Sequence, residues 1–107
     1  MSFIIVLITV PNRDVGLQIA NLLLERKLAA CVNLVSPVNS VYTWQGSVQN
    51  DEETLLIVKS RADLFADQLV PTVQAIHPYQ VPEIIALPVI LGSSAYLDWL
   101  NDSLIAG

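Results

Sequence analysis

The sequence predicts a single α+β domain whose elements follow the order strand, helix, strand, strand, helix, strand. Runs rich in β-branched residues alternate with helical patterns in that order. Two prolines, Pro37 and Pro88, fall inside the second and fourth strand-like runs, and proline cannot donate to a strand ladder. These two strands are therefore expected at the edges of one sheet. The 107 residues leave room for one domain, over residues 1–107.

The first strand and the first helix have the plainest patterns. Residues 3–10 are apolar almost throughout, as in a strand buried on both faces, so this strand is expected at the centre of the sheet. Asn12 can cap a helix that ends near Lys27. The apolar residues expected to face the sheet are Val15, Ile19, Leu22, Leu23 and Leu28.

A long hairpin is expected next. The second strand covers about residues 30–44 with an interruption at Pro37, and a tight turn at Gln45-Gly46 returns the chain as a third strand ending in LLIVK. An unbroken register from this turn places Cys31 opposite Ser60. A bulge at Pro37 would shift that pairing by one residue.

The second helical pattern contains its own start and stop signals. Ser60 with Asp63 is a capping-box-like start. Pro71 lies inside the pattern and is expected to kink the helix or delay its start, and Pro78 marks its end. The apolar residues at helical spacing are Ala62, Phe65, Leu69, Val73 and Ile76.

A short fourth strand over residues 83–90 and a last helix over about residues 94–104 complete the chain. Two consecutive β-α-β halves with right-handed crossovers give a ferredoxin-like antiparallel sheet with two helices on one face. Strands one and three are central in this arrangement, and strands two and four lie outside. The long hairpin and the C-terminal helix are additions to it.

The hairpin predicts self-association. Its arms exceed the ~3 to 10 residues usual for strands, so its distal half extends past the helices. An uncovered edge there, bearing Val38, Val41, Tyr42 and Trp44, is expected to pair with a neighbouring copy of the chain. Composition agrees, because hydrophobic residues make up 53% and charged residues 14% of the chain, against ~25% charged in an average domain.

Charge and cysteine content exclude several classes. A net charge of −5 with five scattered Lys and Arg residues argues against binding to nucleic acid or to an anionic membrane. The one cysteine, Cys31, suits a reducing compartment. The N-terminus has no basic segment and its apolar run is too short for a membrane span, so a cytoplasmic location is expected.

Four blocks of sequence resemble one known family. KLAACVNL, SVYTWQGSVQNDEETLLIVK, HPYQVPEIIALPV and YLDWL together resemble, in order and spacing, the CutA family of divalent-cation tolerance proteins. The resemblance implies a homotrimer of ferredoxin-like subunits joined by strand pairing, similar in architecture to the PII signalling proteins. It also implies a role linked to copper and other divalent ions. The low charge of both helices and the presence of Pro71 depart from the family pattern.

The candidate metal ligands are His77, Cys31 and Glu83. Cu²⁺ prefers imidazole nitrogen with nitrogen or oxygen neighbours, which His77 with Glu83 or a carboxylate of another subunit could supply. One chain has no clustered metal motif, so Cu²⁺ or another divalent cation is expected to bind weakly. The alternatives are that His77 caps the preceding helix and that Cys31 is a small buried hydrophobe.

A ligand-binding cleft between subunits is expected to involve Tyr42, Trp44, Tyr79, Glu83 and Lys59. The two prolines of HPYQVP would hold such a site rigid. Aromatic residues at this spacing are also common in interface cores, and Lys59 could equally be a solvated strand end. Asp51, Glu52 and Glu53 are expected to form a solvated exit from the turn.

Two function classes follow. The first is a trimeric, ion-responsive binding or signalling protein without catalytic activity, whose partner beyond its own copies is unknown. The alternative is a small enzyme that uses His77 and Glu83 as acid and base in a cleft between subunits. The first is preferred, because the sequence offers no nucleophile with an evident base and no phosphate-binding glycine loop.

Overall fold

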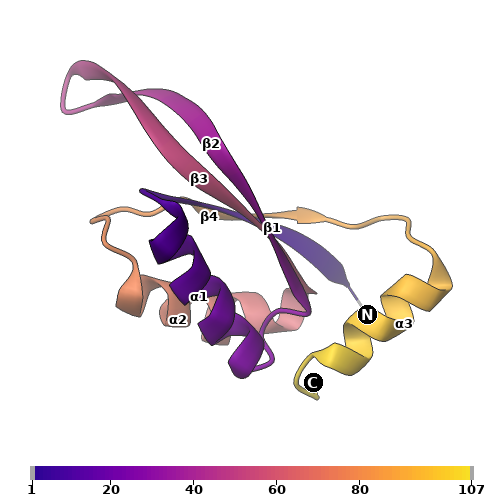
Figure 1. Cartoon of the computed structure of the whole chain (residues 1–107). Helices are drawn as coiled ribbons and strands as arrows, with labels where there is room; N and C mark the ends of the chain where they lie inside the picture. Colours follow the sequence, from indigo (N-terminus) through magenta and orange to yellow (C-terminus); the bar gives the residue numbers. More distant parts are fainter. Residues whose placement is uncertain (1, 107) are drawn as a thin grey trace.

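The computed structural model describes residues 2–106 and contains one four-stranded antiparallel sheet in the order β2-β3-β1-β4 (Figure 1). The strands are β1 (Phe3–Val10), β2 (Cys31–Trp44), β3 (Ser47–Arg61) and β4 (Ile84–Pro88). The predicted α+β, ferredoxin-like class and strand order are confirmed. Pro37 and Pro88 lie on the two edge strands, as their missing donors require.

Helices α1 (Arg13–Glu25) and α2 (Val70–Ile76) lie on one face of the sheet, and α3 (Ser94–Ser103) lies beside them near both chain ends (Figure 1). The Asn12 side chain accepts a hydrogen bond from the Val15 N–H at 2.9 Å, which confirms the predicted cap of α1. Among residues 2–106, no helix has the length and apolar character needed to cross a membrane.

The second helical segment begins differently from the prediction. β3 continues through Ser60 to Arg61, and the Ser60 hydroxyl donates to the Leu28 carbonyl at 2.7 Å, so the expected capping box with Asp63 is wrong. The chain then passes through a 3₁₀ turn (Ala62–Leu64) and a π-helical turn (Phe65–Leu69) before α2. Pro71 lies in the first turn of α2, where its missing N–H is tolerated. The predicted delay of the helix is therefore confirmed.

Alternate residues of the central strands build the core between sheet and helices. Leu56 and Val58 of β3 are fully buried there against Ile19 and Leu23 of α1. Gly16 lets α1 approach closely, because a Cβ at this position would meet the Leu56 side chain at 3.1 Å. The even-numbered residues of β1 face the same core: Ile4, Val6, Ile8 and Val10.

The opposite face of the sheet is also apolar, although no helix of the described chain covers it (Figure 1). Leu7 lies opposite Ile57 on one side and Ile85 on the other, so the three side chains share this face. Leu87 and Ile85 are about half exposed. We call the apolar residues of this side of the sheet the helix-free face: Ile5, Leu7, Val35, Leu55, Ile57, Ile85 and Leu87.

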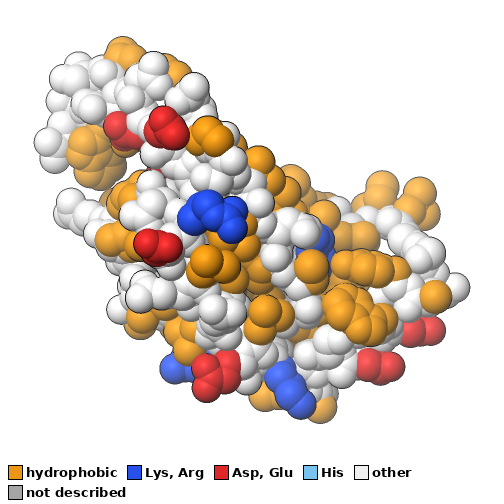
Figure 2. Space-filling model, in the orientation of Figure 1, with side chains coloured by type: hydrophobic (Ala, Val, Ile, Leu, Met, Phe, Trp, Pro, Cys, Tyr) orange, Lys and Arg blue, Asp and Glu red, His pale blue; other side chains and the backbone are white. Residues whose placement is uncertain are grey.

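The hairpin extends past the body of the domain (Figure 1), and its arms of 14 and 15 residues confirm the predicted length. Gln45 and Gly46 both have positive φ, the backbone required by a two-residue hairpin turn. Hydrophobic side chains are visible on the hairpin as well as on the body in Figure 2. Two hydrophobic side chains in the distal half of the hairpin, Val41 and Val48, are 66% and 75% exposed to solvent.

A β-bulge changes which residues of β2 share a face with β3. Val35 pairs with Leu55, but Val38 pairs with Glu53, so Ser36 and Pro37 together oppose one residue. The shift predicted at Pro37 is present, and Cys31 lies opposite Lys59 instead of Ser60. Beyond the bulge, even-numbered residues of β2 turn to the helix-free side of the sheet.

Candidate functional site

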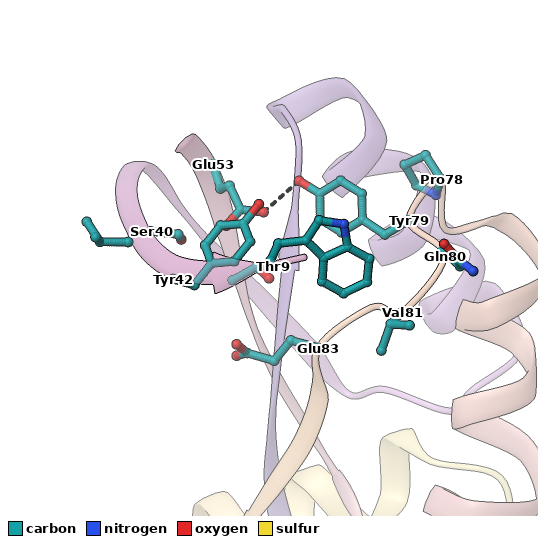
Figure 3. Close-up of a pocket in the computed structure, with 11 residues that line it drawn as sticks. Thr9, Ser40, Tyr42, Glu53, Pro78, Tyr79, Gln80, Val81 and Glu83 are labelled. Atoms are coloured by element: carbon teal, nitrogen blue, oxygen red, sulfur yellow. Dashed lines mark hydrogen bonds between the residues drawn. The ribbon is translucent and has the colours of Figure 1, made fainter. Parts of the chain in front are cut away.

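A pocket of about 770 Å³ lies between the distal half of the hairpin and the loop that follows α2 (Figure 3). Its volume is within the range of small-molecule sites. Its walls combine three aromatic rings, two carboxylates and several small polar side chains. The lining residues are Thr9, Ser40, Val41, Tyr42, Trp44, Glu53, Pro78, Tyr79, Gln80, Val81 and Glu83.

The bulge at Pro37 makes this pocket possible. It places Tyr42 opposite Gln49 and Trp44 opposite Ser47, on the same side of the sheet as Glu53. Without the extra residue, a strict two-residue alternation from Val35 would turn both aromatic side chains to the other side. Four of the five predicted cleft residues, namely Tyr42, Trp44, Tyr79 and Glu83, therefore line one pocket.

Lys59 does not line this pocket. Its side chain donates to Asn33 Oδ1 and lies 3.8 Å from Cys31 Sγ, near the start of β2. Thr9 of the pocket pairs with Leu55, four residues along β3 from Lys59. At about 3.3 Å per residue this separation is ~13 Å, so Lys59 belongs to a different part of the sheet.

Glu53 is a pocket residue that the sequence prediction missed. It was expected in a solvated turn exit, but it is only 7% exposed and accepts a hydrogen bond from the Tyr79 hydroxyl at 2.6 Å (Figure 3). Burial and the neighbouring carboxylate raise the pKa of Tyr79 well above its usual value. The Tyr79 hydroxyl therefore stays a donor at neutral pH.

A second tyrosine pairs with an acidic residue at the rim. The Tyr42 hydroxyl donates to Asp51 Oδ2 at 2.5 Å, and this bond raises the pKa of Tyr42. Tyr42 and Trp44 remain 43% and 42% exposed, so both rings have open surface. Among the described residues that line the pocket, none is Lys or Arg. The pocket is accordingly aromatic and anionic.

His77 is buried, and its ring links the end of β1 to the loop after α2. It is 8% exposed, and its Nε2 lies 2.8 Å from the Thr9 carbonyl while its Nδ1 accepts from the Tyr79 N–H at 3.1 Å. These partners assign a neutral ring with the proton on Nε2. The ring also packs against Tyr79 with a centroid separation of 4.8 Å. The His77 ring thus bonds β1 and the loop. His77 is also the C-cap residue of α2, as the capping alternative proposed, but the bond is made by its backbone N–H, which donates to the Val73 carbonyl at 2.9 Å.

The three expected metal ligands do not come together within one chain. His77 uses both ring nitrogens, Cys31 lies near Lys59, and Glu83 lines the pocket. Over residues 2–106 there is no group of three His, Cys, Asp or Glu side chains arranged to hold a metal ion. Cys31 is only partly buried, so its burial favours neither the metal ligand nor the small buried hydrophobe considered from the sequence.

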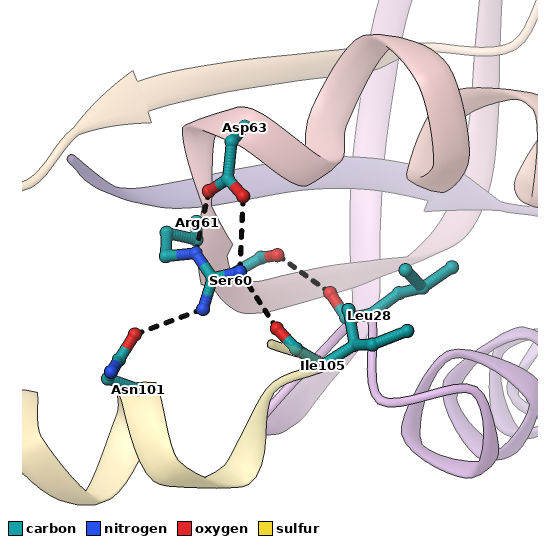
Figure 4. A network of polar contacts seen from close by, with 6 residues as sticks. All are labelled: Leu28, Ser60, Arg61, Asp63, Asn101 and Ile105. Carbon is teal, nitrogen blue, oxygen red and sulfur yellow. Dashed lines mark hydrogen bonds and ion pairs between the residues drawn. The ribbon is translucent and has the colours of Figure 1, made fainter. Parts of the chain in front are cut away.

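A second polar cluster fastens the C-terminal segment to the sheet (Figure 4). Arg61, 3% exposed, makes a bidentate pair with Asp63 at 2.6 and 3.1 Å. It also donates to Asn101 Oδ1 at 3.0 Å and to the Ile105 carbonyl at 2.8 Å. The guanidinium lowers the pKa of Asp63. Because four guanidinium bonds are already made within the chain, we assign this cluster a structural role.

Comparison with known proteins gives the family. The model of the CutA1 divalent ion tolerance protein family matches residues 4–103. The chain belongs to this family. The divalent-cation tolerance protein CutA of Thermus thermophilus is 50% identical over 99 residues, which cover 92% of this chain and 95% of that protein. The resemblance predicted from the sequence is confirmed.

Other CutA1 relatives are longer or come from plants. Protein CutA, chloroplastic, of Arabidopsis thaliana is 52% identical over 100 residues, which cover 94% of this chain but only 54% of that protein. This chain thus spans about half the length of the plant relative. The crystal structure of CutA1 from Oryza sativa superposes with a TM-score of 0.95 at 47% identity, covering 100% of this chain and 97% of that one.

Proposed function

We propose that this chain is a trimeric divalent-cation response protein that binds Cu²⁺ or a related ion weakly and acts by binding, as a PII-like signalling or scaffold trimer. The observation that carries the proposal is membership of the CutA1 family, in which a relative at 50% identity is named a divalent-cation tolerance protein. We propose a cytoplasmic location, while the Arabidopsis relative is named chloroplastic.

The helix-free face and the hairpin support the trimer. A small domain that exposes Ile85, Leu87 and Val35 on one face of its sheet gains by covering them with the same face of another copy. The protruding edge of β2 offers unpaired backbone groups to a neighbouring strand. Both features lie on parts of the molecule that α1 and α2 leave uncovered.

We propose that the cation binds at the pocket carboxylates first. Glu83 is exposed at the pocket and Glu53 lies deeper in it, which offers oxygen ligands to a divalent ion. His77 can add an imidazole nitrogen only when the bond from the Tyr79 N–H to Nδ1 opens, and that requirement weakens the affinity. Cys31 is too remote within one chain and would have to come from a neighbouring subunit.

The proposal of a binding protein also fits the environment of His77. An acid and base pair made of His77 and Glu83 needs a ring nitrogen free to exchange a proton, and both nitrogens are engaged. We therefore propose that the cleft around Tyr79 transmits ligand binding to the trimer, with no chemical step.

Calorimetric titration with Cu²⁺ tests the proposal. We expect weak binding that is tighter at about pH 7.5 than at about pH 5.5, because carboxylate and imidazole ligands must be deprotonated. Glu83→Gln should weaken binding more than Glu52→Gln, the matched control outside the pocket. His77→Ala should also weaken it, with unfolding curves recorded to separate loss of the ligand from loss of the fold. Equal affinities for Glu83→Gln and the unaltered protein would contradict the site.

A further inference from the structure

The pocket contains a buried carboxylate with spare hydrogen-bonding capacity. Glu53 Oε2 accepts from Tyr79, while its other oxygen has no hydrogen bond among the described residues. No fully buried side-chain oxygen of those residues lacks a partner, so this second oxygen is accessible, and Glu53 lines the pocket. A side chain that is 93% removed from solvent therefore presents one acceptor to the pocket interior.

The charges around the pocket are one-sided. Glu53 and Glu83 line it and Asp51 lies behind Tyr42, whereas no Lys or Arg of the described chain lines it. Both cations of β3 are bonded within the chain, Lys59 to Asn33 and Arg61 to Asp63. Arg26, at the end of α1, bonds Thr72. Among residues 2–106 the pocket carboxylates thus have no positive partner, and a bound cation would supply one.

The side chains that line the pocket favour an organic ammonium over a metal ion. The rings of Tyr42, Trp44 and Tyr79 line the same pocket as the carboxylates, and aromatic faces attract ammonium groups, indole most strongly. A divalent ion held weakly by Glu53 and Glu83 would use the carboxylates but not the aromatic rings, and the described chain has no group of three acidic, His or Cys side chains that would hold such an ion tightly against an organic cation. The volume of about 770 Å³ also exceeds what a bare ion fills.

We propose that this pocket binds a free small organic ammonium ligand, with the charged nitrogen between Trp44 and Glu53 and the body of the ligand along Tyr42 and Tyr79. The inference rests on the proposed role of the pocket as the ligand site of the trimer and names the chemical class of its ligand. The polar side chains of Thr9, Ser40 and Gln80 also line the pocket and can bond a hydroxyl or amide on the ligand.

Choline and its neutral isostere 3,3-dimethylbutan-1-ol test the proposal, because the two probes differ only in a charged nitrogen replaced by carbon. Titration is followed by the fluorescence of Trp44 in the Trp99→Phe protein, which retains one of the two indoles of the chain. We expect choline to bind at least about tenfold more tightly than the alcohol. Equal affinities for the two probes would overturn the proposal.

Two matched variants locate the binding. Glu53→Gln keeps an acceptor for Tyr79 but removes the charge and should weaken choline binding about tenfold, while the exposed Glu52→Gln should leave it unchanged. Equal effects of both variants would indicate general charge attraction and overturn the site. Choline binding only after dilution to monomers would show that a neighbouring chain fills the pocket, which also overturns it.

The proposed divalent-cation response is measured separately. Copper titration and sedimentation mass are recorded on the same samples without choline. If choline fails to bind while copper binding and the trimer persist, the ammonium inference alone is overturned. If the trimer or copper binding fails while choline still binds, the proposed function falls and the ligand class stands.

Discussion

The Tyr79 hydroxyl donates to Glu53 at 2.6 Å, and this bond fastens the loop after α2 to β3 across 26 residues of sequence. His77 supports the same arrangement, because its ring accepts from the Tyr79 N–H while bonding the Thr9 carbonyl. The pocket is therefore held by a chain of contacts from β1 through the loop to β3. Its shape depends on polar contacts more than on a packed core.

Tyr79→Phe tests how much this connection stabilises the fold. The substitution leaves the Glu53 carboxylate with no donor, and we expect the free energy of unfolding to fall by about 1–2 kcal/mol. Tyr96→Phe is the control, since Tyr96 is exposed and should change stability by less than about 0.5 kcal/mol. Urea unfolding measures both. A Tyr79→Phe protein as stable as the control would show that water replaces the bond without loss.

Alkaline pH should weaken the fold through the same residue. The pKa of Tyr79 is raised in the folded state, so above the usual value of about 10 the folded protein keeps a proton that the unfolded chain releases. Stability from this group is full below that pH and is lost as pH rises toward the folded pKa.

Unfolding midpoints measured across this alkaline window in the unaltered protein and in Tyr79→Phe give the contribution of Tyr79. We expect a shallower decline in the variant. Tyr42, whose pKa is also raised, contributes in both proteins and therefore cancels in the comparison. Parallel declines would mean that Tyr79 does not titrate differently on folding.

Arg61→Gln should release the C-terminal segment. Breaking a buried ion pair costs about 3–5 kcal/mol, but Asp63 is half exposed and can be hydrated, so we expect the lower part of this range. Hydrogen exchange should accelerate most in α3 and at Ile105, because Asn101 and the Ile105 carbonyl lose their donor. Arg13→Gln on the exposed start of α1 is the control. Uniform acceleration over the whole chain would indicate general destabilisation instead.

Leu87→Glu tests assembly through the helix-free face. Leu87 is half exposed in one chain, so a charge there should leave the subunit folded but prevent burial of this face against another copy. Leu17→Glu is the control, because Leu17 is similarly exposed on α1, on the opposite side of the sheet. Sedimentation should show a smaller species for Leu87→Glu only. A full-sized assembly in this variant would exclude the face from the interface.

The topology could be predicted because it rests on local signals. Pro37 and Pro88 mark edge strands wherever they occur, and the turn at Gln45 and Gly46 needs the positive φ that glycine readily supplies. The start of the second helix could not be predicted in this way, because the Ser60 hydroxyl bonds the carbonyl of Leu28, a residue remote in sequence. Local capping patterns do not reveal such competition.

The sequence predicted the aromatic residues and Glu83 of the pocket, but it did not predict Glu53. Glu53 looks like a continuation of the exposed Asp51 and Glu52, and only the Pro37 bulge and the distant Tyr79 explain its burial. Strand alternation with Leu55 and Ile57 was the available signal that Glu53 faces the helix-free side. His77 was predicted as a metal ligand, whereas its two ring bonds depend on where β1 ends relative to the loop, which local sequence does not reveal.

The two tryptophans provide a final test of which surface holds the proposed trimer together. Trp44 and Trp99 are similarly exposed, at 42% and 47%, but Trp44 lies on the protruding hairpin while Trp99 packs against Tyr96 on α3. Indole side chains are frequent hot spots of interfaces, and a neighbouring subunit can pack on the exposed side of Trp44 while its other side lines the pocket, so Trp44→Ala should speed subunit exchange more than Trp99→Ala. Mixing labelled and unlabelled protein measures the exchange. Faster exchange in Trp99→Ala would identify α3, and not the hairpin, as the main contact between subunits.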